Sequence, residues 1–332
     1  DTHPAVQDAA MCSLVAIGGE VTAWMVLPLL REEARLRNAV MVILKEIGGD
    51  AIPHLPPLLQ DKDDDVRKFA IELLSDAGAR EQSGAFVALL AGDPNPNVRA
   101  AAAKALGALG CREALPSLFA ALKDVEWVRF TVLEALAGMR EESAVEPILL
   151  LLSDPSPATR YAAIEALGAI GSPRVGEALL AHLGAADRDE KAVVLKSLVR
   201  LGVPLPSADL AEDLLGIFRG DYEWEDRLIA LRGLAGIADE AVLRVILDVA
   251  GSLDATKPEE EEILFAVQEH LGGLARPEIL RSLIADPSLR FRGKAIVVEL
   301  AGDLGVRDAL PELVERLRQD VRDVRRAAAH AL

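Results

Sequence analysis

The sequence is poor in aromatic residues and in cysteine. Only 4% of its 332 residues are Phe, Tyr or Trp, and its two cysteines, Cys12 and Cys111, stand 99 positions apart. Two cysteines so far apart exclude a small fold held together by disulfides and favour a reducing compartment. We therefore expect a cytoplasmic protein.

The sequence also lacks long apolar runs and an excess of basic residues. No stretch of about 18 or more uncharged apolar residues occurs, so no transmembrane helix and no membrane partner are expected. Lys and Arg number 36 against 53 Asp and Glu, a net charge of −17. Because nucleic-acid binding requires basic side chains that match phosphates, this balance argues against DNA or RNA as a partner. The acidic surface indicates either a protein partner with a basic surface or a surface that only keeps the chain in solution.

An internal repeat dominates what is present. The segment DPNPNVRAAAAKALGALG (93–110) returns as DPSPATRYAAIEALGAIG (154–171). The arginine in this segment recurs at spacings of 30 to 32 residues, and Lys191 takes the next position. The regular series is Arg37, Arg67, Arg99, Arg129 and Arg160, followed more loosely by Arg227, Arg292 and Arg325. A fixed period of this length predicts a repeat architecture.

Each repeat contains two apolar segments that we expect to be helices. In the second segment, Val98, Ala102 and Leu106 fall on one side of a helix with a period of 3.6 residues, which predicts a single buried face. The first segment has Pro near its start, as at Pro53 and Pro116, where a helix tolerates it. Glycines after the second segment suit a left-handed helix end. The pattern predicts a stack of helical hairpins.

The turn Asp, the Val-Arg pair and the Ala-Ala-x-Ala-Leu-Gly run resemble the HEAT-like repeats, and specifically the short type first described in phycobilisome (bilin) lyases. The resemblance implies an all-α, right-handed α-solenoid of about ten to eleven repeats. It also implies an ion-pair ladder between adjacent repeats, formed by the turn Asp and the helix Arg. The residues concerned are Asp61/Arg67, Asp93/Arg99, Asp124/Arg129 and Asp154/Arg160. Gln7 and Lys191 depart from this pattern.

We expect one solenoid domain over residues 1–332. The repeats are regular in 1–202, irregular and acidic in 203–274, and regular again in 275–332. Between 203 and 262 there are 15 Asp or Glu against 5 Lys or Arg, a net charge of −10. The sequence starts at a turn and stops inside a second helix, so we expect a piece of a longer chain.

No catalytic constellation can be named. The five histidines show no metal-ligand spacing, and none is followed by Glu, so the His-Glu pairs of HEAT-like iron hydroxylases are missing. Asp61, Asp63 and Asp65 resemble the start of a calcium loop, but Val66 stands where such a loop requires Gly. We expect no enzyme activity, no metal and no cofactor. The resemblance leaves a bilin lyase-like enzyme or subunit as the alternative, and a nucleic-acid-binding HEAT-like protein as a weaker one.

The positions that vary between repeats are the candidate binding residues. In HEAT-like solenoids the second helices line the concave face. The position after the arginine, which we call the aromatic row, lies opposite the predicted buried face and is expected to be exposed. It holds Lys68, Ala100, Phe130, Tyr161 and Ala192. The position four residues later, the charged row, holds Glu72, Lys104, Glu134, Glu165 and Lys196.

These rows predict a protein-binding surface formed by Trp127, Phe130, Glu134, Tyr161 and Glu165, with Lys104 beside it. Clustered exposed aromatic side chains are typical of binding sites. The alternative is that the rings only fill gaps left by alanine-rich neighbours. Tyr222 and Trp224, among acidic residues, form a second candidate. The sequence thus predicts a non-catalytic protein-interaction scaffold, and it leaves the partner and the oligomeric state open.

Overall fold

The structure is a computed structural model that describes residues 4–203, 209–234, 237, 239–254, 256–274, 277–319 and 321–332. Regular secondary structure in these ranges is helical, which confirms the all-α prediction. The chain divides into two compact units, unit 1 (Asp1–Val175) and unit 2 (Gly176–Leu332). The changes in repeat regularity expected at 203 and 275 stay predictions, and the proline-containing insertion at 203–210 lies mostly outside the described residues.

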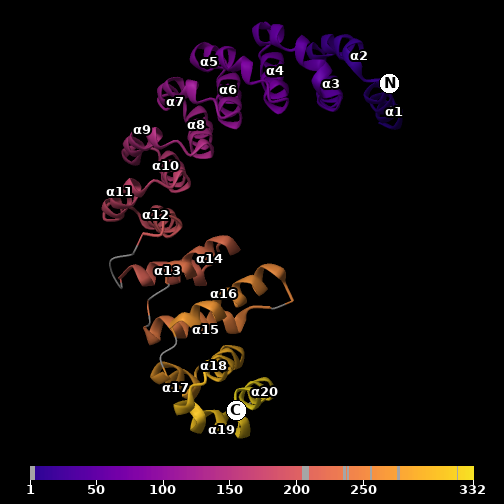
Figure 1. Ribbon diagram of the computed structural model, residues 1–332. Coiled ribbons are helices and arrows are strands. Elements are labelled where there is room, and N and C mark those ends of the chain that lie inside the picture. The colour runs from indigo at the N-terminus through magenta and orange to yellow at the C-terminus, as the bar shows by residue number, and fades with distance from the viewer. Residues whose placement is uncertain are drawn as a thin grey trace. The chain divides into compact units, whose positions relative to one another are not determined.

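Unit 1 is built from repeats in which a short first helix precedes a longer second helix (Figure 1). Its α-helices are α1 (Pro4–Ile17), α2 (Gly19–Val26), α3 (Ala34–Ile47), α4 (Asp64–Asp76), α5 (Ser83–Gly92), α6 (Pro96–Ala108), α7 (Leu115–Ala121), α8 (Glu126–Met139), α9 (Val145–Leu149) and α10 (Pro157–Ile170). Its 3-10 helices are η1 (Leu27–Arg31), η2 (Gly48–His54), η3 (Pro56–Gln60), η4 (Arg80–Gln82), η5 (Arg112–Ala114), η6 (Glu142–Ala144) and η7 (Leu150–Ser153).

The first segments are less regular than the sequence predicted. Residues 48–60 form η2 and η3 instead of one α-helix. Pro53, Pro56 and Pro57 all fall in this stretch, and each removes a backbone donor that a continuous α-helix would need. In α7 a single proline, Pro116, sits at the second helical residue, and the α-helix forms. The three prolines thus account for the 3-10 helices over residues 48–60.

The second helices α4, α6, α8 and α10 stack on one another, and this stacking changes which residues are buried. As predicted, Val98, Ala102 and Leu106 of α6 are buried. Ala100 is buried as well, with only 3% of its surface exposed. Because α6 packs against α4, α5 and α8, three of its sides have neighbours. The prediction of a single buried face was too narrow.

Small residues allow the second helices to approach closely. A Cβ atom built on Gly107 of α6 would lie 2.5 Å from the Cβ of Ala135 in α8. Gly110 and Gly171 adopt φ angles of 62° and 78°, which confirms the left-handed helix ends expected after these repeats. Glycine thus serves two purposes here, one in packing and one in the turn.

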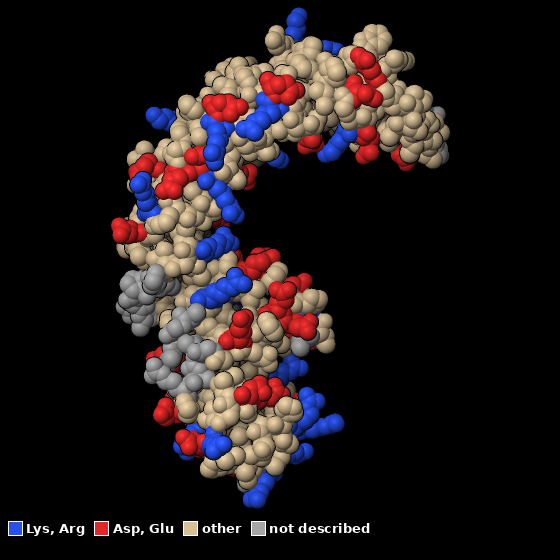
Figure 2. Space-filling view, in the orientation of Figure 1, with Lys and Arg blue, Asp and Glu red and all other residues tan. Residues whose placement is uncertain are grey.

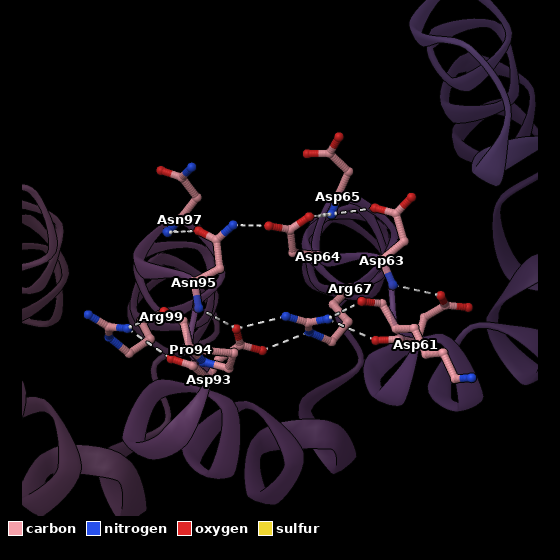
Figure 3. A network of polar contacts seen from close by, with 11 residues as sticks. Asp61, Asp63, Asp64, Asp65, Arg67, Asp93, Pro94, Asn95, Asn97 and Arg99 are labelled. Carbon is pink, nitrogen blue, oxygen red and sulfur yellow. Dashed lines mark hydrogen bonds and ion pairs between the residues drawn. The ribbon is translucent and has the colours of Figure 1, made fainter.

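The arginine ladder joins each repeat to the next (Figure 3). Arg67 donates from Nε and Nη2 to both carboxylate oxygens of Asp93 at 2.7 and 2.9 Å, and from Nη1 to the backbone carbonyl of Asp61 at 2.8 Å. Arg99 repeats this geometry with the carboxylate of Asp124, at 2.7 and 2.6 Å, and with the carbonyl of Asp93, at 2.8 Å. The predicted ladder between repeats is confirmed at these steps, but the ion pairs are Arg67–Asp93 and Arg99–Asp124 instead of Asp61/Arg67 and Asp93/Arg99. Each arginine binds the turn of its own repeat through a carbonyl and the following repeat through a carboxylate.

The ladder continues and then changes at either side of these steps. Arg129 donates to Asp154 at 3.1 Å, and the side chain of Arg160 donates to the carbonyl of Asp154 at 3.0 Å. Towards the N-terminus, Arg37 pairs with Asp63 and Asp65, while Asp61 accepts from Arg31. Asp61, Asp63 and Asp65, which resemble the start of a calcium loop in sequence, therefore contact guanidinium groups.

Unit 2 contains the remaining helices, and α11 spans the boundary between the units. The α-helices are α11 (Pro173–Leu183), α12 (Arg188–Arg200), α13 (Asp209–Arg219), α14 (Trp224–Gly233), α15 (Glu240–Ser252), α16 (Pro258–Leu274), α17 (Pro277–Ala285), α18 (Phe291–Asp303), α19 (Leu310–Gln319) and α20 (Arg322–Ala331), and the 3-10 helix is η8 (Arg307–Ala309).

The polar contacts described next, in unit 2, differ from the arginine ladder of unit 1. Lys196 donates to Asp226 at 2.8 Å, and Arg227 donates to the carbonyl of Phe218 at 2.9 Å. The sequence placed Arg292 at the arginine position of its repeat, and the structure corrects this. The ladder arginines are the fourth residues of their helices, and the fourth residue of α18 is the buried Lys294. Because the spacing of the repeats is irregular here, the sequence alone does not reveal that Lys294, and not Arg292, occupies the arginine position.

Candidate protein-binding surface

The predicted surface lies on α8 and α10, two second helices that stack directly on each other. Phe130 and Tyr161 are the fifth residue of α8 and of α10, so they occupy equivalent places on the two helices. Glu134 and Glu165, one turn further on, are both exposed. The structure therefore brings the two aromatic–glutamate pairs onto neighbouring helices.

Exposure of the aromatic side chains differs from the prediction. Trp127, the second residue of α8, is 57% exposed. Phe130 and Tyr161 are half-buried instead of fully exposed, and Ala100 and Ala192 in the same row are buried. The cause is the stacking of second helices, which covers part of this row from both sides. Trp127 is thus the most accessible aromatic side chain of the candidate surface.

The beginning of α8 is tied to the beginning of α10. The Ser156 hydroxyl, which caps α10, donates to the carboxylate of Glu126, the first residue of α8. Val125, the N-cap of α8, is 52% exposed next to Trp127. Val125 and Trp127 are therefore exposed apolar residues at the start of α8, which this hydrogen bond ties to α10.

A hollow of about 390 Å³ lies between α3, α4 and α6. Met41, Val42 and the alanines of α6 form its apolar part, and Lys45, Glu72 and Lys104 stand at its edge. The Nζ atom of Lys45 donates to Asp76 at 2.7 Å, and this hydrogen bond raises the pKa of Lys45. The hollow was not predicted from the sequence, although the small residues Ala101, Ala105 and Ala108 at helical spacing indicate it.

Lys104 connects this hollow to the predicted surface, since it belongs to α6, the helix that packs between α4 and α8. Its side chain is exposed, and among the described residues it has no ion-pair partner. Glu72, by contrast, lies 3.7 Å from Lys68 on the same helix. Lys104 is therefore available to bind an acidic group of a partner.

The second candidate consists of Tyr222, just before α14, and Trp224, the first residue of α14. Tyr222, 40% exposed, lines a small hollow of about 180 Å³ together with Lys191, Glu212 and Arg219. Trp224, half-buried at the first residue of α14, does not line it. The candidate formed by Tyr222 and Trp224 therefore stays a prediction.

Two histidine–carboxylate pairs were not foreseen. His182 Nε2 lies 2.9 Å from an oxygen of the buried Glu190, and His54 Nε2 lies 3.0 Å from Glu20. Their partners stand eight and 34 residues away in the sequence, so no pair of adjacent residues marks them. In the described ranges, no group of three or more His, Cys, Asp or Glu side chains is arranged to hold a metal ion.

Charge is distributed unevenly within unit 2 (Figure 2). Acidic side chains gather over α14 and α16, and basic side chains gather over α20. In α20 the exposed arginines are Arg322, Arg325 and Arg326. Among the described helices, none is long and apolar enough to cross a membrane.

Comparison with known proteins agrees with this architecture. A family model of HEAT repeats matches residues 52–130, 84–142 and 124–199. The crystal structure of importin beta, in an ammonium sulfate condition, is similar with a TM-score of 0.52 and 14% identity over 93% of this chain and 51% of the other. That of Kap121p is similar with a TM-score of 0.50 and 16% identity over 93% of this chain and 40% of the other. The chain spans about half or less of these two proteins.

A shorter similarity involves the complex of CpcE and CpcF of phycocyanin lyase from Nostoc sp. PCC7120, with a TM-score of 0.43 and 20% identity over 66% of this chain and 94% of the other. No curated protein sequence matches the chain. At 16% and 14% identity, the similarities to Kap121p and importin beta concern the fold alone, which is an α-solenoid. The matched repeats cover residues 52–199 and the arginine ladder falls in the same range, so this part of the chain is built from HEAT repeats.

Proposed function

We propose that the chain is a non-catalytic scaffold that binds a segment of another protein on the surface formed by α6, α8 and α10. The observation that carries this proposal is the equivalent placement of Phe130 and Tyr161 on stacked helices, each followed by an exposed glutamate, beside a Trp127 that is 57% exposed. A large aromatic side chain in water costs free energy, and covering it on binding recovers that cost.

The partner chemistry follows from the side chains. Trp127 and Val125 fit an apolar residue of the partner, and Glu134 and Glu165 fit basic residues placed beside it. Lys104, at the edge of the adjoining hollow, fits an acidic group and would set the direction in which the segment lies. Mixed charges around an apolar centre are typical of surfaces that select one register of a bound segment.

Site-specific crosslinking tests this proposal in the full chain. A photoreactive phenylalanine analogue at Glu134 should give a defined crosslinked product with a partner in cells, which mass spectrometry identifies. The purified partner should then bind the Trp127→Ala/Phe130→Ala variant about 30-fold or more weakly, since truncation of an interface anchor costs ~2 kcal/mol or more. The Phe291→Ala variant, which removes an exposed aromatic side chain of unit 2, is the control and should bind like the wild type.

Two results would contradict the proposal. One is equal affinity of the wild type and the double variant for the crosslinked partner. The other is a large loss of thermal stability in the double variant, because it would mean that the rings fill gaps in the core instead of forming a binding surface. Circular dichroism of both proteins separates these outcomes.

A further inference from the structure

Helix α16 of unit 2 presents an outward face that the sequence analysis did not identify. Phe265 is 67% exposed, the largest exposure of any aromatic side chain in the described part of the chain. Glu261, Glu262 and Glu269 are exposed on the same side of the helix, because residues three and four positions apart lie on one face. We call these four residues the α16 face.

The α16 face repeats the arrangement of the surface on α8. In α8 the buried residues Val128, Val132 and Leu136 follow a four-residue spacing, with Phe130 and Glu134 two positions after the first and the second. In α16 the residues Ile263, Val267 and Leu271 are buried with the same spacing. Phe265 and Glu269 are therefore the equivalents of Phe130 and Glu134.

The equivalence was hidden in the sequence for a physical reason. Helix α16 has 17 residues, against 14 in α8, so it begins about one turn earlier relative to its buried side. The residue that corresponds to the ladder arginine is Leu264, which cannot form the ion pair. Without an arginine at this position, the sequence does not show which residues of α16 correspond to those of the other second helices.

The glutamates of the α16 face are uncompensated. In the described residues Glu261, Glu262 and Glu269 have no ion-pair partner. Their neighbour Glu260 differs, since it accepts from Lys257 at 2.8 Å and from the backbone of Asp254 at 2.6 Å. A purely apolar partner that covered Phe265 would remove water from these carboxylates without replacing its hydrogen bonds, which is unfavourable. A partner with an apolar side chain surrounded by basic side chains can cover the ring of Phe265 and form ion pairs with these carboxylates.

The helix also sets the spacing that such a partner needs. Four residues of an α-helix rise ~6 Å, so Glu261 and Glu269 are each about one turn from Phe265 along the axis. A helical partner matches this spacing with an apolar residue four positions from each of two basic residues. We propose that the α16 face binds a basic helical segment with the pattern Lys/Arg-x-x-x-apolar-x-x-x-Lys/Arg. This surface belongs to unit 2 and does not depend on the surface proposed on α8.

A designed peptide tests the proposal directly. The probe is a fluorescein-labelled 21-residue helical peptide with Leu at its centre and Lys four residues to each side, and its control has the same composition in shuffled order. Fluorescence anisotropy should show that the chain binds the probe at least tenfold more tightly than the shuffled peptide. The Phe265→Ala variant should lose about tenfold in affinity for the probe, and the affinity of the wild type should fall as salt is raised.

Matched variants separate this surface from other sources of binding. Phe291 is also an exposed aromatic residue of unit 2, at the start of α18, and Phe291→Ala should bind the probe like the wild type. On α8 the ring of Phe130 is half-buried and Glu126, four residues before it, accepts from the Ser156 hydroxyl, so Phe130→Ala should lower the affinity for the probe less than Phe265→Ala does. Comparison of the two variants distinguishes failure of one surface from failure of the other. Equal binding of the two peptides, or equal binding by wild type and Phe265→Ala, would overturn the proposal. Absence of measurable binding by the wild type would do the same.

Discussion

The arginine ladder should contribute measurably to the stability of unit 1, and Asp124→Asn is the sharpest test. Asp124 accepts from Arg99 Nε and Nη2 at 2.7 and 2.6 Å. The Arg99 and Asp124 side chains are only 15% and 17% exposed. Asparagine has nearly the same shape, but it carries no charge and offers one acceptor oxygen where the guanidinium meets two. The substitution therefore removes the interaction without opening a cavity.

The magnitude follows from the partial burial of this pair. A hydrogen bond to a charged group contributes ~1.5–3 kcal/mol, and breaking a fully buried ion pair costs ~3–5 kcal/mol. Because the remaining exposure lets water screen the charges, the cost is lower than for a fully buried pair, and we expect a loss of about 2 kcal/mol in the free energy of unfolding at pH 7. Asp76→Asn breaks the exposed pair with Lys45, whose two side chains are 65% and 53% exposed, and should change stability little.

The pH dependence gives an independent check of the same interaction. The hydrogen bond from Arg99 lowers the pKa of Asp124 below its ordinary value. A carboxyl group with a lowered pKa in the folded state stabilises the protein above its unfolded pKa of ~3.9 and loses this contribution as the pH falls through the folded pKa. The free energies of unfolding of wild type and Asp124→Asn should therefore differ most at neutral pH and converge below about pH 4.

Urea unfolding followed by circular dichroism measures both effects. Hydrogen exchange of α6 and α8 complements it, because repeats of a solenoid can open locally before the whole chain unfolds. A difference of less than ~0.5 kcal/mol at pH 7 would place the pair among ordinary surface ion pairs and refute the reasoning. So would a difference that is as large at pH 3 as at pH 7.

Two further predictions concern packing and protonation. Gly107→Ala should destabilise the chain by ~1–3 kcal/mol, because the new Cβ would lie 2.5 Å from that of Ala135. Gly138→Ala, in a helical position with nothing within 4 Å, should be neutral or stabilising by up to ~1 kcal/mol, and thermal melting compares the two. Burial lowers the pKa of His270, so the unfolded chain takes up its proton first as the pH falls below ~6.5. Stability should decline from pH 7 to pH 5, and His270→Leu should reduce that decline in urea titrations.

The repeat could be predicted from the sequence because the joint between repeats has strict chemical requirements. A guanidinium group bonded to a carbonyl and a carboxylate needs Arg and Asp at fixed places, as at Arg67 and Asp93. These residues recur with a period that is readable without a structure. Lys294 shows the limit of this approach, since once the arginine is absent the register must be read from burial, which a sequence does not display.

The exposure of the side chains that follow the ladder arginines was predicted less well than their position on the helices. The place of Phe130 and Tyr161 on their helices was correct, but a helical wheel treats a helix as having one packed side. In a stack, the size of the side chain decides what remains visible. Ala100 is too short to extend beyond its neighbours and is 3% exposed, whereas Phe130 in the same row is half-buried.

This dependence on side-chain size explains why the ladder residues and the candidate binding residues occupy different positions in each second helix. The fourth residue of each second helix is constrained by the ladder, and replacing it costs stability in two repeats at once. The next residue varies in size between repeats and can be Ala, Phe or Tyr, as Ala100, Phe130 and Tyr161 show. When it is large, it reaches past the neighbouring helices and becomes available to a partner. Phe265 is such a residue in a repeat that has no ladder arginine. Its position can be found from the spacing of the buried residues Ile263, Val267 and Leu271 instead of from the repeat motif.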